Sequence, residues 1–232
     1  MFIGKIEAAG DARQLLGQLI ASRLAAAADG LRAQWEVPGR IPTAYVDGLM
    51  PDAVVHAVHA AFPAPAVRKR KRLFGEGPVD AVPAEAPDSL LAEAVHAFRD
   101  PAVVAQLARI TGLAKLEPDC ASHAAAISAM GQGDRRQPHC DDGHDPERRR
   151  IRVLTLEWHV SPGWDEPHGG NLQLWDKGPG GLPRTITGHF NRLVLIGVDA
   201  PAWQSVNAVR VAQVRCCVAN AYFLPGAVER GE

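Results

Sequence analysis

His139 and Asp141 are the two residues whose types and spacing most clearly suggest chemistry. Side chains at positions i and i+2 of an extended segment point to the same side, so this imidazole and this carboxylate can both reach one metal ion. Together they make two thirds of the facial triad that holds non-heme Fe(II) and leaves coordination positions open. Cys140, between them, is expected to point the opposite way. The alternative is an exposed turn, because residues 142–145 read Asp-Gly-His-Asp.

The composition favours one sizeable domain or a domain with a helical extension. The chain has 232 residues, of which 47% are hydrophobic, and its formal net charge is −1. This content is enough for a packed core, whereas the near-zero charge gives no reason to expect a nucleic-acid or membrane-surface partner. No apolar run approaches the roughly 20 residues that span a bilayer, and no N-terminal stretch resembles a signal peptide. Four cysteines without a CxxC pair suggest reduced thiols, so we expect a cytoplasmic protein.

The elements that must position these residues change in type along the chain. Apolar spacing, prolines and glycines predict helices at 11–30, 52–62, 89–98 and 101–111, with one early strand at 41–46. After Lys115, alternating patterns and turn residues predict strands at 123–130, 152–160, 171–175, 184–187, 192–197 and 215–223. The polar, proline-rich segment 67–87 is expected to form a loop or lid. Helices followed by strands indicate an α+β domain built on an antiparallel β-core.

A set of short motifs in the second half of the chain resembles one enzyme family in order and spacing. The motifs are Ala126–Met130, Pro138–Asp141, Gly169–Trp175, Phe190–Leu195, Trp203–Val206 and Arg215–Phe223. From Ile41 to the C-terminus, the sequence resembles the Fe(II)/2-oxoglutarate-dependent oxygenases, in particular the branch similar to prolyl 4-hydroxylases. The resemblance implies a double-stranded β-helix, a jelly-roll or cupin-like open barrel with supporting N-terminal helices. We expect a helical extension at 1–40 and the oxygenase-like domain at 41–232.

The resemblance implies roles for individual residues. His139 and Asp141 correspond to the first two Fe(II) ligands, and Arg215 corresponds to the cation that pairs with the distal carboxylate of 2-oxoglutarate. Gln204 stands where relatives carry a histidine as the third ligand. Because a neutral amide oxygen is a poorer ligand for Fe(II) than imidazole, we expect weaker metal binding or a ligand from elsewhere, with Gln204 lining the cavity as the alternative. The spare imidazoles that could replace it are those of His144, His168 and His189.

A second departure lies on the segment Arg152–Val160. Period-two alternation places Thr155, Glu157 and His159 on one face, and by resemblance this face lines the co-substrate site, where relatives have an apolar residue at 157 and a tyrosine at 159. We therefore take Glu157 and His159 as candidate catalytic residues, and Thr155, His159 and Arg215 as candidate cofactor-binding residues. A carboxylate beside Arg215 would compete with 2-oxoglutarate. The site would then accept another co-substrate or none, or Glu157 or His159 would bind the metal. The alternative without a catalytic role is that Glu157 is a buried acid paired with Arg215 or His159.

These features favour a non-heme Fe(II) oxygenase that hydroxylates or otherwise oxidises a small-molecule or amino-acid-like substrate with 2-oxoglutarate and O2. Two other hypotheses stay open: a divergent member with an altered metal set that does other oxidative or lyase chemistry without 2-oxoglutarate, and a non-catalytic binding module. The lack of a basic or aromatic nucleic-acid surface argues for a small substrate. The apolar stripe of the helix at 11–30 is expected to pack either on the barrel or on a second subunit, the latter giving a homodimer.

Overall fold

The helices come first and most strands follow, as the sequence predicts. The computed structural model describes residues 3–63, 70–71, 79–81, 90–119, 127–140, 144–145, 150–198 and 202–225. Its helices are α1 (Ile3–Trp35), α2 (Asp52–Ala60), α3 (Leu90–Ala97), α4 (Pro101–Thr111) and the short 3-10 helix η2 (Glu166–His168). Its strands are β1 (Thr43–Val46), β2 (Arg70–Lys71), β3 (Val79–Ala81), β4 (Glu117–Pro118), β5 (Ile127–Met130), β6 (Arg136–Cys140), β7 (His144–Asp145), β8 (Arg150–His159), β9 (Leu172–Leu174), β10 (Arg184–Ile186), β11 (Arg192–Gly197), β12 (Trp203–Val206) and β13 (Arg215–Pro225).

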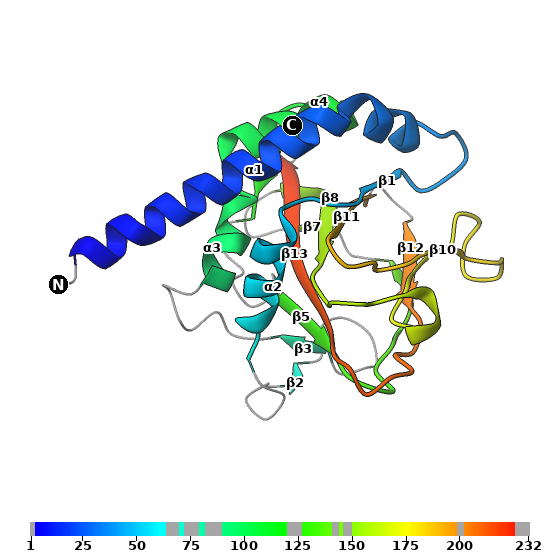
Figure 1. Cartoon of the computed structure of the whole chain (residues 1–232). Coiled ribbons are helices and arrows are strands. Elements are labelled where there is room, and N and C mark those ends of the chain that lie inside the picture. Colours follow the sequence, from blue (N-terminus) through cyan, green and yellow to red (C-terminus); the bar gives the residue numbers. More distant parts are fainter. Residues whose placement is uncertain are drawn as a thin grey trace.

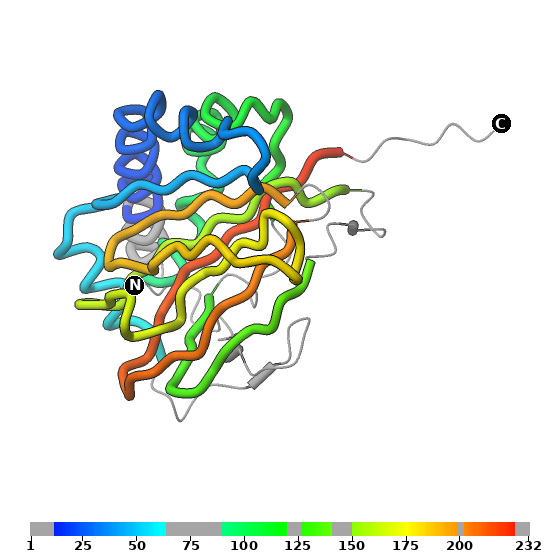
Figure 2. The backbone as a smooth tube through the Cα atoms, turned by 90° about the vertical axis from the view of Figure 1, so that its right-hand side faces the viewer, coloured from blue at the N-terminus to red at the C-terminus, as the bar shows by residue number. Residues whose placement is uncertain are grey.

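Two antiparallel sheets form an open barrel. The large sheet has the order β1-β11-β8-β13-β5-β3-β2, with β4 added beside β13 and β7 beside β8, and the small sheet has the order β10-β9-β12-β6. Apolar residues of the small sheet (Leu172, Leu174 and Ile186) pack against Val194 and Ile196 of β11 in the large sheet. The two sheets therefore face each other across an interior, and Figure 2 shows the strands running in these two layers beneath the helices. This arrangement confirms the α+β double-stranded β-helix expected from the sequence.

The helices cover the opposite face of the large sheet. Leu154, Leu156 and Trp158 alternate along β8 and are all 0% exposed. They belong to the main core, which also contains the apolar stripe of α1 from Leu16 to Leu31. Figure 1 shows α1 and α4 side by side above the strands β8 and β13. The stripe of α1 thus packs on the barrel domain itself, which holds the large sheet rigidly from behind.

Some bounds differ from those that the sequence predicts. The helix expected at 11–30 is part of the longer α1, and Gly30 does not end it because tertiary packing continues, with Leu31 only 1% exposed. The segment 67–87, expected as a loop or lid, contains β2 and β3, which extend the large sheet beyond β5. The rest of that segment lies outside the described residues, and the division of the chain at residue 40 stays a prediction. In the described part of the chain, no helix has the length and apolar character needed to cross a membrane.

Candidate active site

His139 and Gln204 lie opposite each other on neighbouring strands of the small sheet. They are direct partners on β6 and β12, and Gln204 is also the partner of Leu174 on β9. Directly opposite residues of an antiparallel pair point to the same face. Because Leu174 lies in the apolar cluster between the sheets, together with Val194 and Ile196, His139 and Gln204 are on the inner face of the barrel.

The backbone orients the ring of His139. Its Nδ1 lies 2.8 Å from the carbonyl oxygen of Gln137. A carbonyl only accepts hydrogen bonds, so Nδ1 carries the proton and Nε2 carries the lone pair that a metal would take. Gln204 is 8% exposed and brings its amide to the same face. The exposed Cys140 pairs with Trp203 in register, one position along from His139, and so points to the outer face as expected.

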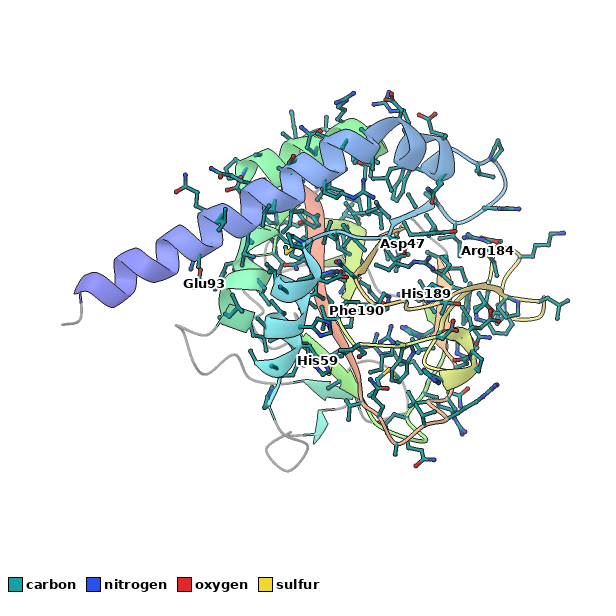
Figure 3. All side chains as sticks on the ribbon, in the orientation of Figure 1. Asp47, His59, Glu93, Arg184, His189 and Phe190 are labelled. Carbon is teal, nitrogen blue, oxygen red and sulfur yellow. The ribbon has the colours of Figure 1, made fainter. Side chains whose placement is uncertain are left out.

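Asp141, the expected carboxylate ligand, lies outside the described residues. The spare imidazoles have other positions. The Nδ1 of His168 accepts a hydrogen bond from the backbone of Asp165 at 3.1 Å, within the cap of η2. The ring of His189 lies 3.7 Å from the carboxylate of Asp165, and Figure 3 shows it next to Phe190 on the connection that leads into β11. The backbone of His144 pairs with β8 at the edge of the large sheet.

A second group of polar side chains lies on the inner face of the large sheet. We call it the polar cluster, and it consists of Thr155, Glu157 and His159 from β8 with Arg215 and Cys217 from β13. Its placement follows from the register, because Glu157 is the partner of Val194, and Thr155 is the partner of Ile196, on β11. Both apolar partners face the small sheet. The alternation expected for β8 is therefore confirmed, with the polar residues inside the barrel and the apolar residues beneath the helices.

Arg215 is paired with Glu157 inside the barrel. Its Nη2 donates a hydrogen bond to the Oε2 of Glu157 at 3.1 Å, and the two side chains are only 3% and 13% exposed. The Nη1 of Arg215 lies 3.7 Å from the sulfur of Met130. On the other side, a Cβ placed on Gly170 would lie 2.8 Å from the Cδ of Arg215, so the backbone packs directly against the arginine stem. The cation expected to bind a co-substrate carboxylate thus already has a carboxylate partner and little room to turn away.

His159 is a buried imidazole in a largely cationic environment. It is 1% exposed, and neither ring nitrogen has a hydrogen-bond partner within the described residues. Burial lowers the pKa of His159 well below its ordinary value, and repulsion from Arg215, Arg192 and His189 lowers it further. Although its Nε2 lies 3.7 Å from the Oε2 of Glu157, the ring is therefore neutral near pH 7 and the contact is not an ion pair.

Cys217 joins the polar cluster. Ligand atoms of Glu157, His159 and Cys217 all lie within 4.8 Å of one another. Burial raises the pKa of the Cys217 thiol far above its ordinary value, and the charge of Glu157 raises it further. Because the guanidinium of Arg215 lies beside the same carboxylate, a second cation at this place would be repelled. The i, i+2 spacing of Arg215 and Cys217 is the sequence signal that places both on one face.

Arg192 is a second cation close to His159, and its charge is balanced by Asp47, which follows β1. It is the partner of His159 in the register of β11 and β8. Its Nε and Nη2 donate to the two carboxylate oxygens of Asp47 at 2.6 and 2.8 Å. This two-pronged hydrogen bond, together with the charge of Arg192, outweighs burial and lowers the pKa of Asp47. Figure 3 shows Asp47 above His189.

Comparison with known proteins agrees with this geometry. Residues 125–223 match the model of the 2OG-Fe(II) oxygenase superfamily. The match covers β5 to β13 and therefore the strands that carry His139, Gln204 and the polar cluster. The matched superfamily consists of enzymes, and the similarity implies Fe(II) and 2-oxoglutarate as cofactors. A search of curated proteins found no match.

Several solved structures share the fold at low sequence identity. A prolyl-4-hydroxylase from Pseudomonas putida is 16% identical, with a TM-score of 0.54 over 88% of this chain and 100% of that one. A prolyl hydroxylase from Trichoplax adhaerens, in complex with a hypoxia-inducible-factor peptide, is 15% identical, with a TM-score of 0.57 over 91% of this chain and 90% of that one. SnoN, an alpha-ketoglutarate-dependent epimerase from nogalamycin biosynthesis, is 16% identical, with a TM-score of 0.58 over 86% and 83% of the two chains. At these identities the likeness concerns the fold.

The residues fit the two implied cofactors unequally. The inner face of the small sheet presents an oriented imidazole, His139, directly opposite an amide, Gln204, which is a donor set suited to a divalent metal. The polar cluster, by contrast, does not present a free cation for the distal carboxylate of 2-oxoglutarate, since Arg215 is bonded to Glu157. We therefore take iron as compatible with the described residues and 2-oxoglutarate as disfavoured by Glu157 where it lies.

Proposed function

We propose that the protein is an Fe(II)-dependent oxygenase that uses O2 to hydroxylate or otherwise oxidise a small-molecule or amino-acid-like substrate. His139, Asp141 and Gln204 hold the metal. The observation that carries the proposal is the register that sets His139 directly opposite Gln204 on the inner face of the small sheet. Iron held there would supply the centre at which O2 is activated, while the two sheets enclose the substrate.

The substrate class rests on charge and on the relatives. The formal net charge of the chain is −1, which does not suit a polyanion. Relatives with the same fold include prolyl hydroxylases and SnoN, an epimerase from nogalamycin biosynthesis. These relatives span an amino-acid side chain and a natural-product pathway, which supports a small or amino-acid-like substrate.

A metal titration tests this proposal. Apo-protein is titrated anaerobically with Fe(II), and 2-oxoglutarate is then added while the visible charge-transfer band of an iron-bound keto acid is monitored. We expect one metal ion per chain and loss of binding in His139→Ala. If the protein takes up no metal, the oxygenase proposal is wrong and a binding module becomes the better description.

The Gln204→His variant sharpens the same test. Restoring imidazole opposite His139 should raise Fe(II) affinity by about tenfold or more, because imidazole is a much better ligand than a neutral amide. Gln18→His adds a histidine on the exposed side of α1 and should leave the affinity unchanged. An equal gain in both variants would show that surface histidines, rather than the barrel interior, bind the added metal.

A second candidate function is oxidative or lyase chemistry without 2-oxoglutarate. It is supported by the ion pair of 3.1 Å between Arg215 and Glu157. Tight metal binding without a charge-transfer band on adding any 2-oxo acid, 2-oxoglutarate included, would favour this candidate. In Glu157→Leu, which removes the competing carboxylate, the band should then appear, and its continued absence would show that Glu157 is not the obstacle.

A further inference from the structure

We propose that the polar cluster selects a 2-oxo acid whose far end is an uncharged hydrogen-bonding group, and that it disfavours the carboxylate end of 2-oxoglutarate. The inference rests on the proposed iron-dependent function and assigns its co-substrate class. It follows from the pairing of Arg215, the fixed positions of the pair, and the buried groups around it.

Two cations at this place, Arg215 and Arg192, are already paired with carboxylates. Arg215 is bonded to Glu157 at 3.1 Å, and the neighbouring Arg192 is bonded to Asp47 at 2.6 Å. A ligand carboxylate that reached the same guanidinium would come close to the carboxylate of Glu157, in a part of the barrel where Arg215 is 3% exposed. Repulsion between two like charges is strong where water is excluded. An uncharged end brings no such repulsion.

Neither partner can easily move aside. The stem of Arg215 lies between Gly170, where a Cβ would be 2.8 Å from its Cδ, and the sulfur of Met130, 3.7 Å from its Nη1. Glu157 is in the middle of β8, with Val194 of β11 and Ala219 of β13 as its partners on either side. The backbone of Glu157 is therefore held by strand pairing on two sides, and that of Arg215 pairs with Met130 of β5. A dicarboxylate would have to displace a bonded side chain.

Unpaired donors point to a neutral acceptor. The Nε of Arg215, the hydroxyl of Thr155 and both ring nitrogens of His159 are buried without a hydrogen-bond partner among the described residues. Buried polar groups are normally hydrogen-bonded. Arg215, Thr155 and one nitrogen of His159 are donors. A carbonyl or hydroxyl oxygen at the end of a 2-oxo acid would accept from one of these donors without adding charge.

Three acids that share the 2-oxo group but differ at the far end test this inference. Calorimetric titrations of the anaerobic Fe(II)-loaded protein compare 2-oxoglutarate, its C5 methyl ester, which keeps the acceptor carbonyl but not the charge, and 2-oxopentanoate, which has neither. We expect the ester to bind about tenfold or more tightly than 2-oxoglutarate, and more tightly than 2-oxopentanoate. In Glu157→Gln the preference should reverse towards 2-oxoglutarate, whereas Glu117→Gln, an exposed acid on β4, should behave as the wild type.

The outcomes separate this inference from the proposed function. Metal uptake is measured before any acid is added, so its failure overturns the iron-dependent function and the inference that rests on it. Metal uptake followed by tighter binding of 2-oxoglutarate than of the ester, or by binding of neither acid, overturns only the inference. The wild-type comparison alone decides this, even if the Glu157 variant does not fold.

Discussion

The two faces of strand β8 differ in almost every physical respect, although they alternate residue by residue. Leu154, Leu156 and Trp158 are 0% exposed and pack beneath the helices. Their neighbours Thr155, Glu157 and His159 point into the barrel. There, an ion pair, a neutral imidazole and polar groups that have no hydrogen-bond partner in the described part of the chain replace apolar contacts. One face stabilises the fold, and the other is polar at a cost in stability that a purely structural strand would avoid. Such a cost indicates that the inner face is kept for binding.

The largest effect should come from the helix-covered face. Trp158→Ala removes a fully buried ring that lies 6.1 Å from the ring of Phe98, and it should lower the free energy of unfolding by about 3–5 kcal/mol. Trp158→Phe keeps most of the volume and removes an indole N–H that has no partner in the described residues, so it should cost much less. Urea unfolding followed by circular dichroism measures both, and equal losses would show that this face is not tightly packed.

The ion pair of the inner face should behave differently from an apolar contact. Arg215→Leu leaves Glu157 without its cation and should cost about 3 kcal/mol of stability. The double variant Arg215→Leu with Glu157→Leu should recover much of that loss, because no charge is then left buried alone. Urea unfolding of the wild type, both single variants and the double variant gives the coupling free energy. Simple additivity would mean that the two groups do not stabilise each other.

The buried imidazole of His159, on the inner face of β8, should make the free energy of unfolding depend on pH. Because the pKa of His159 is lower in the folded protein than the ordinary histidine value of 6.5, the unfolded chain takes up a proton first as the pH falls. The contribution of the neutral His159 ring to the free energy of unfolding is therefore fully present above about pH 6.5. As the pH falls from there towards the pKa of His159 in the folded protein, this free energy decreases by up to about 1.4 kcal/mol per pH unit. His159→Leu should flatten the curve in this window. Unfolding free energies at pH 7.5, 6 and 5 test it, and an unchanged slope in the variant would assign the effect to another group.

The smallest effect is expected away from both faces. Leu182 lies in the connection between β9 and β10 and is 96% exposed. Leu182→Ser should change the free energy of unfolding by less than about 0.5 kcal/mol and leave metal binding unaltered. A larger change, measured by the same urea unfolding, would indicate that this loop contacts something other than solvent.

Local signals in the sequence predict those elements whose ends are set by local chemistry. The bounds of α4 follow from Asp100, whose carboxylate accepts from the backbone of Ala102, from Pro101 in the first turn, and from Gly112 in the left-handed conformation. The two faces of β8 follow from its period-two pattern. Neither case depends on distant residues.

The remaining elements depend on partners far away in the sequence. The strands β6 and β12 are short and rich in polar residues, and they are extended because β12 pairs with both β6 and β9. The register that brings Gln204 opposite His139 joins positions 65 residues apart, which no local pattern specifies. The pairing of Arg215 with Glu157, by contrast, is predictable from alternation on two strands once the family resemblance makes those strands neighbours.

The outward direction of Cys140 has a practical consequence. A thiol-reactive fluorophore attached there would lie outside the sheet, one residue from His139, while Cys216 and Cys217 are buried and protected from the reagent. With Cys120 replaced by serine, such a label would report on the loading of the barrel through the strand itself, without occupying any of the space that a substrate needs.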